Sequence, residues 1–298
     1  MTRRPQIALL SDGRRLHLQD GPIDLIVDAR GRADAVRAAY EAAALRFTGL
    51  LDELCAELPE LRSGAGRRTS LKGVVARCMH AAVVPYAADC FITPMAAVAG
   101  SVAEEILAAM LRAAMLDRAY VNNGGDIALH LGKGEQFSVG LMDRPGRDGV
   151  MRTMRIDADD PVRGVATSGR HGRSFSLGIA DAVTVLAVTA SQADAAATVI
   201  ANAVDLPGHP AIIRKPANEL QPDSDLGGRL VTRDVGELSH HEIAAALESG
   251  AECARHLFDR RLIEGAVLQL CGDMLVIGPK DIERLESRPR QLENAVHA

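Results

Sequence analysis

The longest apolar run in the chain, Ala81 to Gly100, bears first on whether this is a membrane protein or a globular one. A helix that spans a bilayer needs about 20 uninterrupted apolar residues. Here Pro85, Asp89 and Pro94 break the run, and an acidic pair that begins at Glu104 follows it closely. Because proline interrupts the hydrogen-bond ladder of a helix, we expect two buried elements separated by a loop and no transmembrane helix.

Composition indicates a globular domain with an unusual core. The 298 residues are 47% hydrophobic but only 3% aromatic, with no Trp, so the core must be built from Ala, Val, Leu and Ile. The formal net charge of −5 mixes both signs along the chain, which gives no electrostatic basis for binding nucleic acid or an anionic membrane. An anionic ligand must therefore be held by local groups.

The cysteines and the N-terminal segment bear on the compartment. Five cysteines, an odd number with no Cys-x-x-Cys pair, fit a reducing compartment better than a disulfide framework. The apolar stretch near the N-terminus is too short for the hydrophobic region of a secretory signal peptide. We therefore expect a cytoplasmic protein.

Hydrophobic spacing alternates along the chain between the period of strands and that of helices, which is typical of an α+β fold. We expect antiparallel sheets and packed helices in a single domain, 1–284, followed by a loose charged tail, 285–298. The expected strands lie within 5–28, 118–142, 164–190, 229–235 and 264–278, and the expected helices are 31–57, 96–116, 191–204 and 239–260. The last helix opens on Ser239 and Glu242, which have capping-box spacing.

A short internal echo suggests a repeat. "GGDIALHLG" in the middle of the chain and "CGDMLVIG" near its end both enter an apolar strand through Gly-Asp. This similarity suggests that two similar sheet layers face each other.

The segment "NNGGD" supports two interpretations. Its glycines, Gly124 and Gly125, would let the backbone approach a ligand closely, and successive N–H groups of such a turn bind phosphate oxygens. Asn123 and Asp126 flank them. However, Asn-Gly is also the commonest signal of a short hairpin turn.

A second glycine-rich segment, "TSGRHGRS", adds side chains that donate hydrogen bonds to a pyrophosphate. The alternative interpretation is a solvated loop. The candidate donors are Thr167, Ser168, Arg170, Arg173 and Ser174.

A metal site is one interpretation of "SQADAAAT". Asp194 and Thr198 are four residues apart, so on a helix their oxygens project from one face and could share a hard cation such as Mg²⁺. Asp181, at the head of a strand, is a second carboxylate that could approach the same place. Alternatively, Ser191 and Asp194 form a capping box, in which Asp194 only satisfies backbone donors.

Taken in series, "PMAAVAG", "NNGGDI", "VATSG" and "ADAAAT" resemble the motifs of the ApbE-like proteins, whose best-known members are FAD:protein FMN transferases. The chain is most similar to an uncharacterised branch of that superfamily. The resemblance extends from about residue 23 to about residue 204.

The resemblance implies an α+β fold with an FAD site between layers and Mg²⁺ near the pyrophosphate. Asp194 and Thr198 would match the metal ligands of the transferases. The residues that would correspond to the dinucleotide site are Met95, Ala96 and Gly100 at the helix start, Asn123, Gly124, Gly125 and Asp126 at the flavin-side turn, and Thr167, Ser168 and Gly169 in the second loop.

Two departures from the transferase pattern bear on activity. The helix start "PMAAVAGSVAEE" has no Lys, and no His followed by Asp-Pro comes after the "TSG" loop. Accordingly, the expected function is a flavin-dependent reductase or redox partner that acts on a small, for example heterocyclic, substrate. The alternatives are a Mg²⁺-dependent FAD:protein FMN transferase with a protein acceptor, and a nucleotide-binding scaffold without chemistry. We assign no catalytic base from the sequence.

Overall fold

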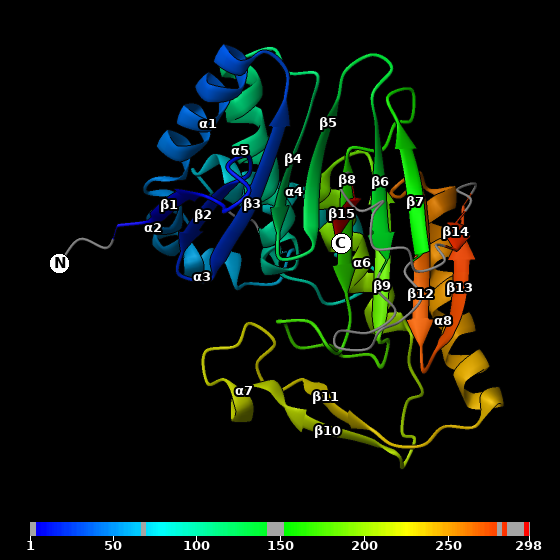
Figure 1. Ribbon diagram of the computed structural model, residues 1–298. Helices are drawn as coiled ribbons and strands as arrows, with labels where there is room; N and C mark the ends of the chain where they lie inside the picture. The colour runs from blue at the N-terminus through cyan, green and yellow to red at the C-terminus, as the bar shows by residue number, and fades with distance from the viewer. Residues whose placement is uncertain (1–3, 67–69, 142–151, 279–281, 285–294, 298) are drawn as a thin grey trace.

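The computed structural model describes residues 4–66, 70–141, 152–278, 282–284 and 295–297. These residues form three layers: a layer of helices, a nine-stranded sheet, and a four-stranded sheet on the other face of the large one (Figure 1). A two-stranded arm lies apart from the layers. The predicted α+β architecture, with antiparallel strands and packed helices, is confirmed.

The nine-stranded sheet is antiparallel throughout. Its strands, in spatial order, are β1 (Gln6–Leu9), β2 (Leu16–Asp20), β3 (Ile23–Arg30), β4 (Arg118–Asn123), β5 (Asp126–Leu131), β8 (Gly164–Ser168), β9 (Ala182–Ala187), β12 (Gly265–Leu270) and β13 (Asp273–Ile277). The four-stranded sheet has the order β14 (Ile282–Arg284), β7 (Arg152–Asp157), β6 (Gln136–Leu141) and β15 (Ala295–His297). The arm consists of β10 (Ile212–Pro216) and β11 (Leu230–Val235).

Strand alternation explains how the large sheet is covered on both faces. In β5, Ile127 and Leu129 pack against the small sheet, whereas Ala128 packs against the helices. In β12, Val267 faces the small sheet and Leu268 the helices. Since both faces of these strands are apolar and buried, the strand ends are where this sheet can present polar groups to a ligand.

The helices cover one face of the large sheet. They are α1 (Ala33–Phe47), α2 (Leu50–Ala56), α3 (Leu58–Leu61), α4 (Val74–Val83), α5 (Val98–Ala113), α6 (Ala190–Ala203) and α8 (His240–Asp259), with 3₁₀ turns η1 (Val84–Tyr86) and η2 (Pro94–Ala97). The short α7 (Ala217–Leu220) lies beside β10 of the arm instead. The capping box of Ser239 and Glu242 at the start of α8 is confirmed. The helix expected over 31–57 is divided after Phe47, because Gly49 adopts a left-handed conformation with φ of 85°.

The apolar run from Ala81 to Gly100 forms the elements that were expected. It forms two elements, α4 with η1 and η2 with α5, separated by a loop. The second of these, Pro94–Ala113, is long and apolar enough to cross a membrane by length and composition alone, but 56% of its apolar window is buried inside the fold. Val102, Ile106 and Met110 have no exposed surface. The apolarity of this segment is thus accounted for by the core.

The internal echo corresponds to two equivalent hairpins. The β4–β5 hairpin turns through Gly124 and Gly125, with φ of 67° and 113°, and the β12–β13 hairpin turns through Cys271 and Gly272, with φ of 52° and 92°. Both hairpins belong to the same nine-stranded sheet. The prediction that the echo marks two similar sheets facing each other is therefore wrong: the small sheet that faces the large one contains neither hairpin.

The arm and the C-terminal residues differ from the sequence expectations in detail. The predicted strand 229–235 is β11, and its partner β10 was not predicted because "IIRKP" contains no strand-like alternation. Of the tail, 285–298, residues 295–297 form β15, which pairs in parallel with β6. Residues 285–294 and 298 lie outside the described part of the chain.

Helices α5 and α6 cross in direct contact at Gly100. A Cβ atom at this position would overlap the carbonyl oxygen of Ala190 and lie 2.9 Å from the backbone nitrogen of Ser191. Since both obstacles are backbone atoms in the first turn of α6, neither can rotate away. Glycine is therefore required here by the approach of the two helices.

We expect Gly100→Ala to destabilise the protein by about 2 to 3 kcal/mol, because the added methyl group must push the two helices apart. Chemical denaturation followed by circular dichroism measures this change. Gly228→Ala is the matched control, since a Cβ atom there meets nothing within 4 Å. Equal stabilities of the two variants would contradict the close crossing.

Candidate functional site

The candidate site lies where the β4–β5 turn meets the start of α5. The side chain of Asn122 accepts a hydrogen bond from the Gly125 N–H at 2.8 Å and so closes the turn. The buried side-chain amide of Asn123 donates to the carbonyl oxygen of Ala99 at 3.2 Å. The two asparagines thus have separate tasks: one shapes the turn and the other fixes it to the helix.

The two glycine-rich segments come together through Arg173. Its guanidinium group packs on Gly124 so closely that a Cβ atom there would overlap it. The same group donates a hydrogen bond to the carbonyl oxygen of Pro22 at 3.2 Å. Consequently, the β2–β3 turn, the β4–β5 turn and the loop after β8 meet beyond the ends of these strands.

Asp126 is the first of two carboxylates in the site. Its side chain accepts a hydrogen bond from the Thr167 N–H at 3.2 Å, which links the β4–β5 turn to the end of β8. Burial raises the pKa of Asp126 to about 7, although the Thr167 N–H and the charge of Arg173 oppose this shift. A carboxyl group with such a pKa is suited to change its charge, or to receive a cation, near neutral pH.

Asp194 is the second carboxylate, and it does not cap its own helix. The N-cap of α6 is Thr189, whose hydroxyl accepts from the Gln192 N–H at 3.3 Å. The alternative interpretation of Ser191 and Asp194 as a capping box is therefore wrong. Asp194 instead accepts a hydrogen bond from the Gly100 N–H at 3.0 Å, in the first turn of the neighbouring helix α5.

The capping between the two helices is reciprocal. Glu104 of α5 accepts a hydrogen bond at 2.7 Å from the N–H of Ser191, in the first turn of α6. Each helix therefore supplies a carboxylate to the positive end of the other. Glu104 was missed in the sequence because its partner is distant along the chain; the only local signal is its position four residues after Gly100, on the same side of α5.

Asp126 and Asp194 repel each other. Burial raises the pKa of Asp194 well above its ordinary value, and the charge of Asp126 adds to this effect, while the N–H groups of Gly100 and Ala99 oppose it. Thr198 follows one turn later on the same side of α6 and is half-buried. Across the described residues, no three His, Cys, Asp or Glu side chains gather as a metal site. The available set is thus two carboxylates with a nearby hydroxyl.

Asp181 has protein partners of its own. Its Oδ1 accepts from Nε and Nη2 of Arg170 at 2.9 and 2.6 Å and lies 3.1 Å from Nε2 of His171. Its Oδ2 accepts from the Cys271 N–H at 2.6 Å, and the side chain is only 3% exposed. Asp181 therefore anchors the loop after β8 to the β12–β13 turn, and its oxygens are engaged by protein groups and not held free for the metal predicted from the sequence.

The remaining predicted residues surround this core of the site. Gly169 is needed where it stands, because a Cβ atom would lie 2.5 Å from the carbonyl oxygen of Asp181. Met95 and Ala96 form η2 and pack partly against the two helical core clusters. Thr167 also bonds to Thr184, hydroxyl to hydroxyl, at 2.8 Å. Ser168 is half-buried and Ser174 is exposed.

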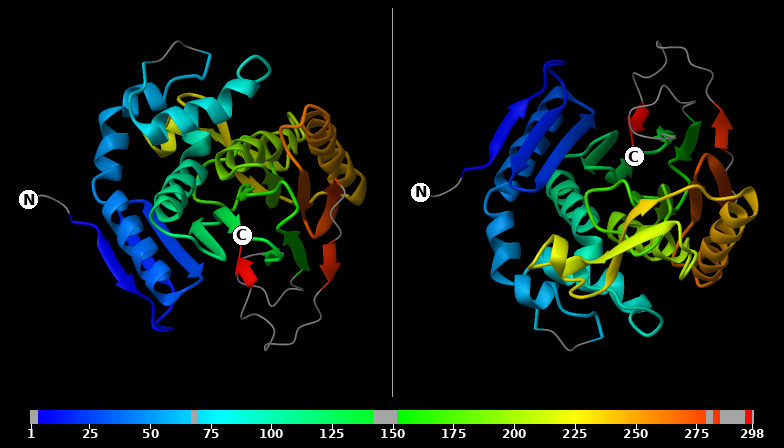
Figure 2. Two further views of the ribbon diagram at one scale, coloured as in Figure 1. Left: turned by 90° about the horizontal axis from the view of Figure 1, so that it is seen from above. Right: turned by 90° about the horizontal axis from the view of Figure 1, so that it is seen from below.

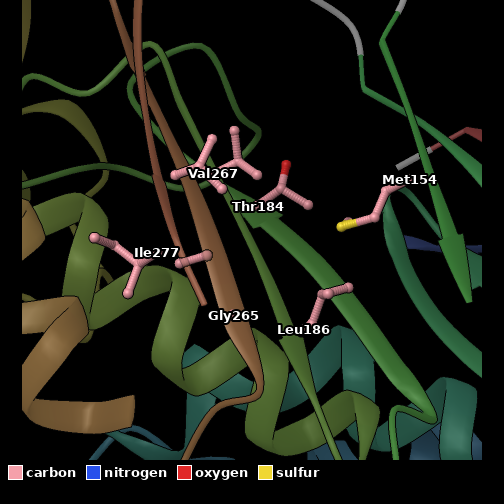
Figure 3. Close-up of a pocket in the computed structure, with 8 residues that line it drawn as sticks. Met154, Thr184, Leu186, Gly265, Val267 and Ile277 are labelled. Atoms are coloured by element: carbon pink, nitrogen blue, oxygen red, sulfur yellow. The ribbon is translucent and has the colours of Figure 1, made fainter. Parts of the chain in front are cut away.

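A small cavity elsewhere in the protein is unrelated to this site. It has a volume of about 10 Å³ and lies between the two sheets. Figure 3 shows Met154 of β7 directed toward Thr184 and Leu186 of β9, with Gly265 and Val267 of β12 nearby. A space of this size holds about one water molecule, so it cannot receive a nucleotide.

Comparison with known proteins identifies the family of this chain. A family model described as "AbpE bacteria" matches residues 7–276, which is most of the length. The chain belongs to this ApbE-like family. UPF0280 protein MK0206 of Methanopyrus kandleri is 34% identical over 192 residues, which cover 63% of this chain and 72% of that protein. A UPF0280 protein of Methanothrix thermoacetophila is 37% identical over 133 residues, which cover 44% of this chain and 52% of that protein.

A solved structure shows the same fold. The apo form of the flavinyl transferase ApbE of Pseudomonas stutzeri matches 92% of this chain and 94% of its own, with a TM-score of 0.51 and 12% sequence identity. At this identity the likeness concerns the arrangement of helices and strands. The resemblance read from the motifs is confirmed at the level of family and fold.

The carboxylate pair predicts a pH dependence. A folded-state pKa of about 7 for Asp126 lies above the ordinary value, so the protonated group favours the fold below about pH 4, and this contribution is lost as the pH rises to about 7. At pH 7.5, without divalent cations, we expect Asp126→Asn to be more stable than the wild type by about 1 to 2 kcal/mol. At pH 4 the difference should disappear.

Urea denaturation at the two pH values measures this difference, and Asp159→Asn, at an exposed position, is the control. Addition of Mg²⁺ at pH 7.5 should stabilise the wild type but neither Asp126→Asn nor Asp194→Asn. A difference between wild type and Asp126→Asn that does not change with pH would contradict the repulsion between the two carboxylates.

Proposed function

We propose that this ApbE-like protein binds FAD together with a divalent cation at the candidate site. We further propose that the bound flavin serves a reductase or redox-partner function toward a small substrate, for example a heterocycle. The observation that carries the proposal is the convergence of Asp126 and Asp194 at the strand ends where the glycine-containing turns and Arg173 meet.

The donor set fits a hard divalent cation. Burial raises the pKa of both carboxyl groups, and the charge of Asp126 adds to the shift of Asp194. A cation that replaces the proton would stabilise such a pair. Thr198 supplies a hydroxyl on the same side of α6 as Asp194. Asp126 and Asp194, with Thr198 nearby, would hold Mg²⁺, and the bound cation would neutralise charge on a pyrophosphate.

The helix start argues for the cation as an intermediary. In other proteins the positive, N-terminal end of a helix commonly binds phosphate directly. Here the Gly100 N–H already donates to Asp194, so this part of the helix end holds a carboxylate and not a phosphate. A pyrophosphate would therefore meet the cation on Asp194, and Arg173, which packs against Gly124, would complete its neutralisation.

The choice of redox chemistry over transfer depends on which groups the chain supplies. The first turns of α5 carry Glu104 and Glu105 and no Lys. His171 is paired with Asp181 and anchors a loop, so the transferase pattern of His with Asp-Pro is not reproduced. Retention of Asp194 and Thr198 favours the second candidate, a Mg²⁺-dependent FAD:protein FMN transferase, which would release AMP and label a protein hydroxyl.

We expect FAD to bind more tightly than FMN, because only FAD has the pyrophosphate that the cation and Arg173 would recognise. Calorimetric titration of both cofactors, with and without Mg²⁺, measures this difference. Arg173→Ala should weaken FAD binding about tenfold, or 1.4 kcal/mol, and Arg233→Ala, an exposed change on β11, should leave it unchanged. Equal or undetectable binding of the two cofactors would exclude the flavin proposal.

A second experiment separates the candidate chemistries. The protein is incubated with FAD, Mg²⁺ and a cell extract, then denatured, and protein-bound flavin fluorescence is measured. We expect no covalent flavin, because loss of a positioned acid or base typically lowers the rate 10²- to 10⁴-fold. Rapid labelling that depends on Mg²⁺ would favour the transferase, and FAD binding with neither labelling nor redox cycling would favour a scaffold.

A further inference from the structure

Strand β1 forms an unusual edge of the large sheet. It is the outermost strand, and no described strand pairs with its outer side. Figure 2 shows it at the margin of the molecule in both views. Its four residues are all exposed, and none of them is charged. Natural edge strands are usually protected from pairing by charges, bulges or proline, and here only Pro5, just before the strand, provides such protection.

The exposed side chains of β1 continue the apolar core. Ile7 and Leu9 lie opposite Leu18 and Leu16 of β2 and therefore share their face of the sheet. Leu16 and Leu18 are buried beneath the helices, whereas Ile7 and Leu9 are 42% and 56% exposed. The helical layer thus covers β2 but not β1, and the side chains of Ile7 and Leu9 extend beyond it.

The alternation of hydrogen-bonding direction along β1 determines which backbone N–H and C=O groups are free at this edge. The N–H of Leu10, just after β1, donates to the carbonyl oxygen of Arg15, the residue before β2. Since the direction alternates along a strand, the even-numbered residues of β1 bond to β2. The N–H and C=O groups of Ile7 and Leu9 therefore point outward.

We propose that β1 pairs with β1 of a second copy of this chain, antiparallel and centred on Ala8, so that the two large sheets become continuous. In this register Ile7 of each copy pairs with Leu9 of the other, and all four outward N–H groups are satisfied. A register centred on Ile7 would place Leu9 against Pro5, which has no N–H to donate. The self-complementary strand thus favours a second copy over an unrelated partner.

Pairing centred on Ala8 also brings the exposed apolar side chains of the two copies together. The apolar strip formed by Ile7 and Leu9 of both copies joins the two helix-side cores. A four-residue strand pair buries less than the roughly 1,200 Å² of a stable interface, so the dimer should dissociate on dilution.

Sedimentation velocity of the full chain over a concentration series tests the proposal. We expect a reversible dimer whose dissociation constant rises at least tenfold in Ile7→Lys. Leu45→Lys replaces an apolar residue that is 79% exposed on α1 and is the matched control; it should leave the dimer unchanged. Circular dichroism checks that both variants remain folded.

Hydrogen exchange reports on the edge itself. The Ile7 and Leu9 amides should become protected as the concentration rises, whereas the Ala8 amide, which bonds to β2, should be protected throughout. A monomer at all concentrations would overturn the proposal, and so would a dimer that Ile7→Lys leaves intact. Neither result depends on flavin binding.

Discussion

The contact between Gly100 and Ala190 is the constraint on which the candidate site depends. Glycine lets α5 approach the first turn of α6 without a side chain between them. At that distance Glu104 reaches the N–H of Ser191, and Asp194 reaches the N–H of Gly100. The crossing thus fixes Asp194 at the start of α5. Asn123 ties the end of β4 to the same helix start, and so Asp126, just past the turn, is held close to Asp194.

Holding these groups together is unfavourable for the fold itself. Two partly buried carboxylates repel each other, and backbone N–H groups relieve only part of that repulsion. A chain selected for stability alone would place an amide or an apolar side chain at one of these positions. Retaining both acids is consistent with a bound cation, because a cation converts the repulsion into attraction. The repulsion between Asp126 and Asp194 and the proposed cation site therefore have the same origin, the close approach of these two side chains.

Local signals in the sequence predicted local structure well. Asn-Gly specified the β4–β5 turn, Ser239 and Glu242 specified the start of α8, and alternation specified the closing hairpin. Features that depend on contacts distant along the chain were missed. The carboxylate of Asp194 acts on a neighbouring helix, so its spacing from Ser191 misled, and the Gly-Asp echo could not show whether its two copies share a sheet. The family motifs named residues from separate segments, and the structure brings several of them into contact, which periodicity alone could not predict.

The positions of the two Gly-Asp turns in the sheet explain why the candidate site occurs at only one of them. The turn before Asp126 lies in the middle of the large sheet, where β5 meets β8 and α5 meets α6. It therefore has a helix from the second half of the chain, and Asp194 with it, as a neighbour. The turn before Asp273 lies near the far edge of the sheet, and Asp273 is exposed; its Cys271 N–H instead binds Asp181. The β12–β13 hairpin, near the edge of the sheet, thus binds a loop through Asp181. The β4–β5 hairpin, at the centre, places Asp126 close to Asp194. The pair of carboxylates forms because β5, which carries Asp126, and α6, which carries Asp194, lie side by side in the fold.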